Sequence, residues 1–128
     1  VQAPIVEWYN NSWFATSQPE SFFLPEAGYI APPLDGVWAT APYLHNGSVP
    51  TIEDLLNSKQ RPTHWKRSGL SDDYDYQKVG WNYTAKNNGS GKWTYDTTIP
   101  GYSNAGHYFG DKLTIDQRSA VIEYLKTL

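Results

Sequence analysis

Three histidines are the side chains in this sequence best suited to binding a metal or moving a proton, because the 128 residues contain no cysteine and no methionine. His45 precedes a turn expected at Asn46-Gly47, and His107 lies between two nearby glycines. Such loops can aim an imidazole at a ligand, although most histidines of this kind simply bond nearby backbone. His64 lies in a polar stretch, where a solvated loop is expected. His45 and His107 are therefore the histidines favoured for a functional role.

The spacing of the histidines argues against a metal site built from them alone. His45 and His64 are 19 residues apart, and His64 and His107 are 43 apart, so no pair has the i, i+4 spacing of helix-borne ligands. The acids of residues 72–75 could supply oxygen ligands to calcium, but no EF-hand loop surrounds them, and calcium is only a minor alternative. No motif identifies a catalytic residue. The absence of cysteine excludes covalent attachment of haem through C-x-x-C-H by this chain.

The composition indicates an ordered, loop-rich chain with few aliphatic core residues. Val, Ile and Leu total 21, against 20 aromatic residues, with 10 Gly and 9 Pro. A core built largely from rings needs partners for their OH and NH groups, so we expect another segment or molecule to complete it. Ten basic residues against thirteen acidic ones, without a basic run, make nucleic acid a poor partner. No apolar stretch is long enough for a membrane span.

Three helices are expected around a long irregular middle. Residues 4–14 have apolar spacing typical of a short helix, and the prolines and glycines of residues 17–36 indicate extended chain. Thr51 is expected to cap a short helix, because acids follow it in the first turn. Thr114 and Gln117 form a capping box for a helix that runs to the C-terminus. Its apolar stripe consists of Val121, Ile122, Leu125 and Leu128.

Residues 80–98 contain the one strand pattern of the sequence. Aromatic residues alternate with polar ones on both sides of Asn88-Gly89, which predicts a β-hairpin that turns at these two residues. Trp81 and Trp93 are then expected on facing strands. With the helices, this predicts a mainly α, loop-rich architecture that has one β-hairpin.

Four segments, in order along the chain, resemble one family. Residues 28–51 read GYIAPPLDGVWATAPYLHNGSVPT, which resembles a segment of the di-haem cytochrome c peroxidase superfamily, closest to the branch that includes the bacterial rubber oxygenases. Residues 76–81 (YQKVGW), 97–107 (TTIPGYSNAGH) and 113–128 (LTIDQRSAVIEYLKTL) resemble later segments of that branch. The resemblance divides the chain into residues 1–27, which stay unassigned, and residues 28–128.

The resemblance implies that residues 28–128 are the C-terminal part of a cytochrome c-like domain that lacks C-x-x-C-H. Haem c would then be attached elsewhere, on an N-terminal segment or on a separate chain, and residues 28–128 would complete its pocket. The family implies a periplasmic or secreted protein. Any enzyme activity would be that of an oxidoreductase acting together with the haem-bearing part, and peroxide reduction, oxygenation and electron transfer stay open.

The same resemblance assigns roles to individual residues. It implies that His107 is the distal axial ligand of the haem iron, and that Trp38, Pro42, Tyr43 and His45 face the porphyrin. His45 or Tyr43 would donate a hydrogen bond to a propionate. The alternative for His107 is a histidine that caps the following helix or lies in solvent.

A second hypothesis is a haem-free module that binds glycans or a protein partner through its aromatic residues. Its platform would be drawn from the tyrosines and five tryptophans, namely Trp8, Trp13, Trp65, Trp81 and Trp93. Against it stands the simpler interpretation that these rings fill the core.

Overall fold

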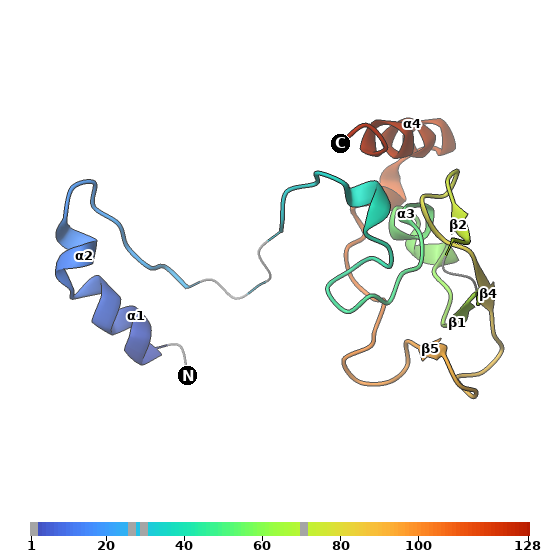
Figure 1. The fold of residues 1–128 in the computed structure, drawn as a ribbon, viewed down its shortest axis with the longest axis horizontal. Helices are drawn as coiled ribbons and strands as arrows, with labels where there is room; N and C mark the ends of the chain where they lie inside the picture. Colours follow the sequence, from blue (N-terminus) through green and yellow to red (C-terminus); the bar gives the residue numbers. More distant parts are fainter. Residues whose placement is uncertain (1–2, 26–27, 29–30, 70–71) are drawn as a thin grey trace. The chain divides into compact units, whose positions relative to one another are not determined.

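A computed structural model describes residues 3–25, 28, 31–69 and 72–128 of the chain. The contacts between residues divide it into two units, Val1–Ala31 and Pro32–Leu128. Figure 1 labels the helices and strands. No helix within the described ranges is long and apolar enough to cross a membrane.

The first unit contains two short helices, α1 (Ala3–Asn10) and α2 (Trp13–Thr16), where one helix over residues 4–14 was expected. After α2 the chain returns along α1. The side chain of Asn10 donates to the carbonyl of Phe23 at 2.9 Å and accepts from the Phe23 amide at 2.8 Å. This pair of hydrogen bonds fixes the returning chain at the end of α1, because the Asn10 side chain satisfies both backbone groups of Phe23.

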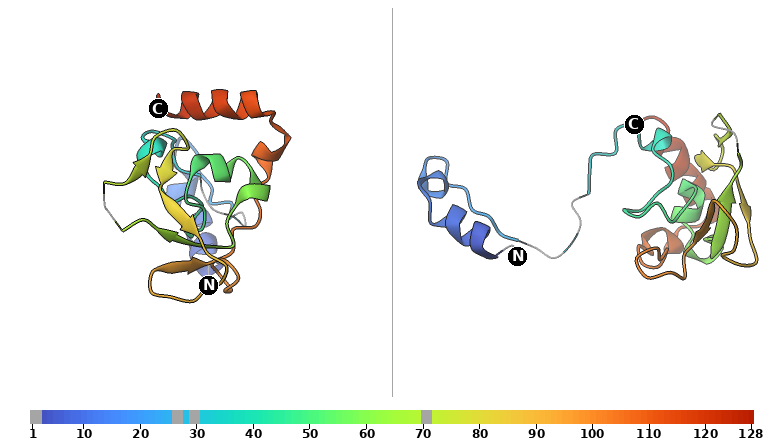
Figure 2. Two further views of the ribbon diagram at one scale, coloured as in Figure 1. Left: turned by 90° about the vertical axis from the view of Figure 1, so that its right-hand side faces the viewer. Right: turned by 60° about the horizontal axis from the view of Figure 1, so that its bottom comes forward.

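Five short strands form two antiparallel sheets in the described part of the second unit. They are β1 (His64–Arg67), β2 (Tyr74–Asp75), β3 (Gly80–Trp81), β4 (Tyr83–Ala85) and β5 (Thr94–Asp96). One sheet has the order β4-β1-β5, and the other pairs β2 with β3. Figure 2 shows the strands and the helix α4 from two further sides.

The expected hairpin is wrong in its pairing. The two predicted strands do not bond each other, because β1 lies between them and pairs with both. Trp65, at the centre of β1, is 3% exposed and stacks on Tyr95 with ring centroids 5.3 Å apart. Trp81 instead pairs with Tyr74 across the β2–β3 sheet, and Trp93 is 77% exposed. The strand β1, which carries the buried ring of Trp65, therefore separates the two predicted strands.

The expectation of a mainly α architecture is also wrong. Of the helices in the second unit, α3 (Ile52–Leu55) is a single turn and α4 (Ile115–Leu125) has 11 residues. The 3-10 helices are η1 (Val37–Ala39), η2 (Ser58–Gln60) and η3 (Phe109–Lys112). Tyr, Trp and Thr between residues 64 and 96 favour pleated chain, and this segment forms the two sheets.

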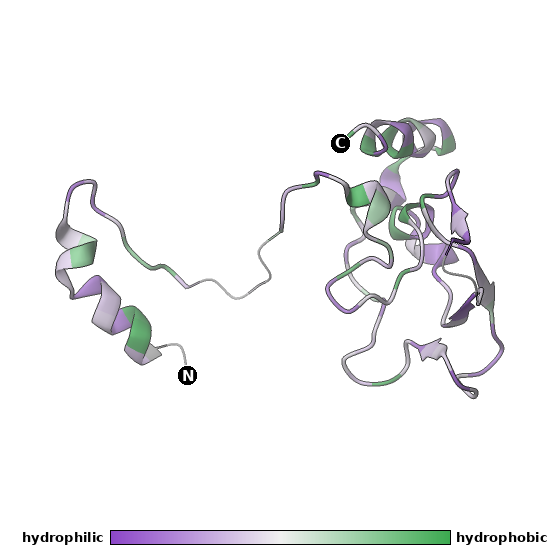
Figure 3. Ribbon diagram, viewed as in Figure 1, coloured by the Kyte–Doolittle hydropathy of each residue, from purple (hydrophilic) through white to green (hydrophobic). Residues whose placement is uncertain are grey.

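Both predicted helix caps of the second unit are confirmed. The Thr51 hydroxyl accepts from the Asp54 amide at 3.1 Å, and Thr114 and Gln117 form the reciprocal capping box. Along α4, Ile122 is buried, and Figure 3 shows hydrophobic and hydrophilic residues interspersed around the helix. The capping box defines the start of α4, and Ile122 and Leu125 pack the helix against the core of the unit.

The core lies where α4, α3 and the segment before α3 meet. Its buried hydrophobic residues are Tyr43, Val49, Ile52, Val79 and Ile122. Residues 48–51 are all buried, and the Trp81 amide donates to the Pro50 carbonyl at 3.0 Å. This buried segment positions the turn that contains His45 on one side and α3 on the other.

Candidate functional site

A buried arginine donates hydrogen bonds to the backbone of the loop that ends at His107. Arg61, which is 9% exposed, donates from one terminal nitrogen to the carbonyls of Asn104 and Gly106, both at 2.7 Å. Its other terminal nitrogen donates to the carbonyl of His107 at 2.9 Å. The Asn104 side chain in turn donates to the carbonyl of Pro62 at 2.9 Å. The backbone of residues 104–107 is therefore fixed on residues 61–62.

The beginning of the same loop is held by the turn that follows His45. The side-chain amide of Asn46 donates to the carbonyls of Gly101 at 3.2 Å and Ser103 at 2.8 Å. The Tyr95 hydroxyl donates to the carbonyl of Asn46 at 2.7 Å, so β5 supports this turn. These bonds join the turn after His45 to the loop that leads to His107, the two segments that the sequence predicts to be functional.

His107 is an exposed residue at the end of this anchored loop. Its φ is +53° and that of Gly106 is +86°. Both residues therefore lie in the left-handed region, which is uncommon for residues with a Cβ such as His107. The imidazole lies near Phe109, with ring centroids 6.4 Å apart, and Phe109 is 88% exposed. An exposed imidazole on a fixed backbone can donate a nitrogen lone pair to a metal ion that another group holds.

The four residues predicted to face the porphyrin do not share one environment. Tyr43 is a core residue, 6% exposed, whose hydroxyl donates to the Val37 carbonyl at 3.1 Å, and burial raises the pKa of this phenol. Pro42 is half-buried, whereas Trp38 and His45 are exposed. Because the hydroxyl hydrogen of Tyr43 is already donated to the Val37 carbonyl within the core, Tyr43 is poorly placed to donate to a propionate.

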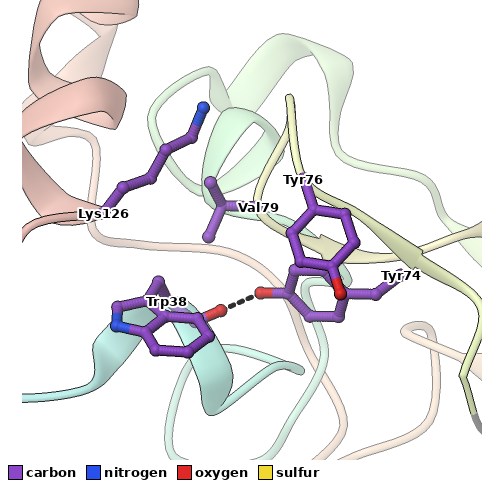
Figure 4. A pocket seen from close by; sticks show the side chains of 5 residues that line it. All are labelled: Trp38, Tyr74, Tyr76, Val79 and Lys126. Carbon is purple, nitrogen blue, oxygen red and sulfur yellow. Dashed lines mark hydrogen bonds between the residues drawn. The ribbon is translucent and has the colours of Figure 1, made fainter.

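Trp38 lies at a pocket rather than on an open face. The pocket has a volume of about 310 Å³, and Trp38, Tyr74, Tyr76, Val79 and Lys126 line it (Figure 4). The Tyr74 hydroxyl donates to the Trp38 carbonyl, and the Trp38 indole donates to the Leu128 carbonyl at 3.2 Å. Three aromatic side chains and one ammonium group could accept a small ligand that has an apolar face and an acceptor group.

No shared metal site forms from the other predicted ligands. Within residues 3–25, 28, 31–69 and 72–128, no three His, Asp or Glu side chains form a group that could hold a metal ion. The Asp73 carboxylate accepts hydrogen bonds from the side chains of Ser68 and Asn82. His64 is on β1 rather than in a solvated loop, 3.3 Å from the Asp96 carboxylate.

The helix α3 contains a buried carboxylate. Asp54 is 5% exposed and accepts a hydrogen bond from the Thr51 hydroxyl at 2.6 Å. Burial raises its pKa, although the hydrogen bonds from Thr51 and Tyr83 oppose that rise. Burial is the main cause that raises the pKa of Tyr83, and the nearby carboxylate of Asp54 raises it further. Asp54 therefore stabilises the start of α3 and is not part of the loop that carries His107.

Sequence reasoning missed the two side chains that organise the site, Arg61 and Asn46. The sequence alone gives no functional role to Arg61, and it assigns Asn46 only to a turn. An arginine followed by a proline and a single Asn-Gly turn give no local signal of contacts 40 or more residues away. Both contacts depend on the tertiary fold.

Comparison with known proteins points to cytochromes. A family model described as RoxA-like, cytochrome c-like matches residues 28–66, which include Trp38, Tyr43, His45 and Arg61. The match supports the predicted likeness to the rubber oxygenase-like branch and indicates a cytochrome-related role. It is shorter than half of the chain, and the wider di-haem peroxidase superfamily stays a prediction.

Two curated proteins of Sinorhizobium fredii are similar to this chain. Uncharacterized protein y4iJ is 45% identical over 111 residues, which cover 78% of this chain and 18% of that protein. Uncharacterized protein y4iM is 54% identical over 54 residues, 42% of this chain and 12% of that protein. The chain thus spans less than a fifth of the length of the curated relatives it matches.

Proposed function

We propose that residues 28–128 complete a haem pocket in a di-haem c-type cytochrome, with His107 as the axial ligand opposite the histidine of C-x-x-C-H. The observation that carries the proposal is the loop of residues 101–107, which two buried or half-buried side chains anchor and which ends in an exposed imidazole. The cytochrome c-like family match supports the choice of group. Because this chain has no cysteine, the haem would be attached to another segment or chain.

The residues around His107 fit such a group. A porphyrin needs an apolar surface beside its axial ligand, and the side chains near His107 in sequence are unusually exposed for their type. Tyr108 is 56% exposed, Phe109 88% and Ile115 81%. Isolated exposed apolar residues are common, but here they occur next to an anchored imidazole. The fit therefore rests on both a nitrogen donor and an uncovered apolar surface.

The expected role of the completed site is electron transfer. Haem iron supplies one-electron redox chemistry, and its potential depends on the axial ligands and on burial. A second strong-field nitrogen from His107 favours a six-coordinate, low-spin iron, which leaves no open position for peroxide or oxygen. Peroxidase or oxygenase activity would then belong to the other haem of a periplasmic or secreted protein.

A haem peptide provides the direct test. The probe is haem c bound to a short C-x-x-C-H peptide, which supplies one axial histidine and leaves one axial position open. Titrating it with the 128-residue chain should give a low-spin optical and EPR spectrum, and His107→Ala should abolish that change. His45→Gln and His64→Gln are the matched controls and should retain it. A low-spin spectrum that survives His107→Ala, or none with the wild-type chain, would contradict the proposal.

The role proposed for His45 has a separate test. In the same complex, His45→Gln should shift the reduction potential of the haem while leaving the low-spin spectrum unchanged, because a propionate partner affects charge rather than ligation. Loss of the low-spin spectrum in His45→Gln would instead make His45 the ligand.

The pocket beside Trp38 favours a second candidate function, a haem-free module that binds glycans. Its walls include Trp38 and Tyr76, rings on which a sugar could stack. Quenching or shift of tryptophan fluorescence by neutral oligosaccharides, lost in Trp38→Ala, would favour this candidate. No response to a panel of oligosaccharides, together with haem-peptide ligation, would exclude it.

A further inference from the structure

We infer that Arg61 is the positioning residue for His107, acting through the backbone of the loop and not through the imidazole. This inference rests on the proposed function of His107. A guanidinium group has five N–H donors, and Arg61 uses all five on backbone carbonyls. They bond Asp54 at 3.2 Å, Leu55 at 2.9 Å, Asn104 and Gly106 at 2.7 Å each, and His107 at 2.9 Å.

The arrangement joins two segments that are far apart in the sequence. Two of the acceptors are at the end of α3, and three are in the loop of residues 104–107, which is 43 to 46 residues further along the chain. Burying a charged group is unfavourable unless its hydrogen bonds are satisfied. With every donor used, Arg61 can remain buried and cationic, although burial lowers its pKa below the ordinary value of an arginine.

The bonds of Arg61 act where the loop backbone is least regular. Gly106 and His107 both have positive φ, a conformation that a histidine adopts at some cost. The carbonyls of these same two residues, with that of Asn104, point at the guanidinium. Arg61 therefore fixes the peptide planes on both sides of the His107 Cα, which sets the direction in which its side chain leaves the backbone.

Loss of Arg61 should weaken ligation without removing the ligand. The loop would sample several conformations, and binding iron would have to select one of them. Groups that orient a metal ligand typically alter metal affinity by about 10- to 100-fold when they are changed. Lysine keeps the charge but has three donors in a compact group, so it cannot reproduce the planar fork.

The experiment compares Arg61→Lys and Arg61→Gln with a matched arginine. Arg118 also donates to backbone, to the carbonyls of Leu56 at 3.1 Å and Leu113 at 3.4 Å, and it does not contact the His107 loop through these bonds. Near-UV circular dichroism reports folding, and titration of the haem peptide reports the dissociation constant. We expect a rise of about 10- to 100-fold in the Arg61 variants, the wild-type low-spin spectrum at saturation, and less than about a twofold change in Arg118→Gln.

A second measurement does not depend on haem. In the wild-type chain, ¹⁵N relaxation should give order parameters near the rigid value of about 0.85 for residues 104–107, and they should fall below about 0.6 in Arg61→Lys. Flexible values in the wild type would overturn the inference even if neither Arg61 variant folds. A folded Arg61→Lys with unchanged affinity would overturn it as well. Absence of low-spin haem with the wild-type chain would count against the proposed function instead.

Discussion

The side-chain amide of Asn46 donates to the backbone carbonyl of Ser103 at 2.8 Å, across 57 residues of sequence. The same nitrogen also donates to Gly101, and the Asn46 side-chain oxygen accepts from the Ser48 amide at 3.2 Å. One side chain thus closes its own turn and anchors the loop that leads to His107. The relationship makes Asn46 the partner of Arg61 at the opposite end of that loop.

We expect Asn46→Ala to lower the free energy of unfolding by about 1–2 kcal/mol, because it removes these hydrogen bonds at a half-buried site. Asn46→Asp should be at least as destabilising at pH 7, since a carboxylate would face the carbonyls of Gly101 and Ser103 without a hydrogen to donate. Urea unfolding followed by circular dichroism measures both variants. An Asn46→Asp variant as stable as the wild type would show that these two bonds do not hold the loop.

The buried carboxyl of Asp54 should make the chain less stable as pH rises. Its folded pKa lies above the ordinary value of 3.8, so the folded state holds its proton more tightly than the unfolded state does. The contribution is fully present below about pH 4 and is lost as pH rises through the folded pKa. The pKa values of Asp73, Asp96 and Asp111 in the folded chain lie below the ordinary value of 3.8. These three carboxylates therefore have the opposite effect, and the stability that they contribute is lost as pH falls below 3.8.

Asp54→Asn is the variant that isolates this effect. An amide can still accept hydrogen bonds from Thr51 and Tyr83 but cannot ionise. The difference in unfolding free energy between Asp54→Asn and the wild type should therefore shift in favour of the variant as pH increases from 4 to 8. Urea unfolding midpoints at four or five pH values measure it. A difference that is constant with pH would mean that Asp54 titrates normally.

Two glycines should be intolerant of alanine because backbone fills the space of a Cβ. At Gly110 an added Cβ would lie 2.6 Å from the Cα of Leu56, and at Gly80 it would lie 2.6 Å from the Cα of Thr51. Backbone cannot move aside as a flexible side chain can, so we expect each alanine to cost about 2–3 kcal/mol of unfolding free energy. Gly69→Ala is the control, because no atom lies within 4 Å of its added Cβ. Thermal unfolding distinguishes them, and a tolerated Gly110→Ala would contradict the packing of η3 on α3.

Trp65 and Trp93 should differ sharply in their effect on stability. Trp65 is 3% exposed, and its indole donates to the Ser48 carbonyl at 3.0 Å, so Trp65→Ala should cost about 3–5 kcal/mol. Trp93 is 77% exposed with φ of +69°, so Trp93→Ala should change stability by less than about 0.5 kcal/mol. Chemical unfolding of both variants tests the sheet order. A large loss in Trp93→Ala would favour the direct Trp81–Trp93 hairpin instead.

Local sequence was sufficient where the interactions are themselves local. The Thr51 cap and the Thr114–Gln117 capping box join residues three positions apart, and their side-chain types specify the bonds directly. The helical character of residues 4–14 and the stripe of α4 follow from apolar spacing in the same way. Prolines and glycines around residue 45 likewise mark a turn, which the structure forms at Leu44–Gly47.

Only the tertiary structure decided which strands pair and which side chains hold the site. The alternating segments on both sides of Asn88-Gly89 could pair directly, but the buried ring of Trp65 provides both with a better apolar partner, and β1 separates them. Arg61 and Asn46 each bond carbonyls more than 40 residues away. A carbonyl exists at every residue, so the sequence contains no sign of which ones a distant donor will reach, and that choice is made when the core brings the loops together.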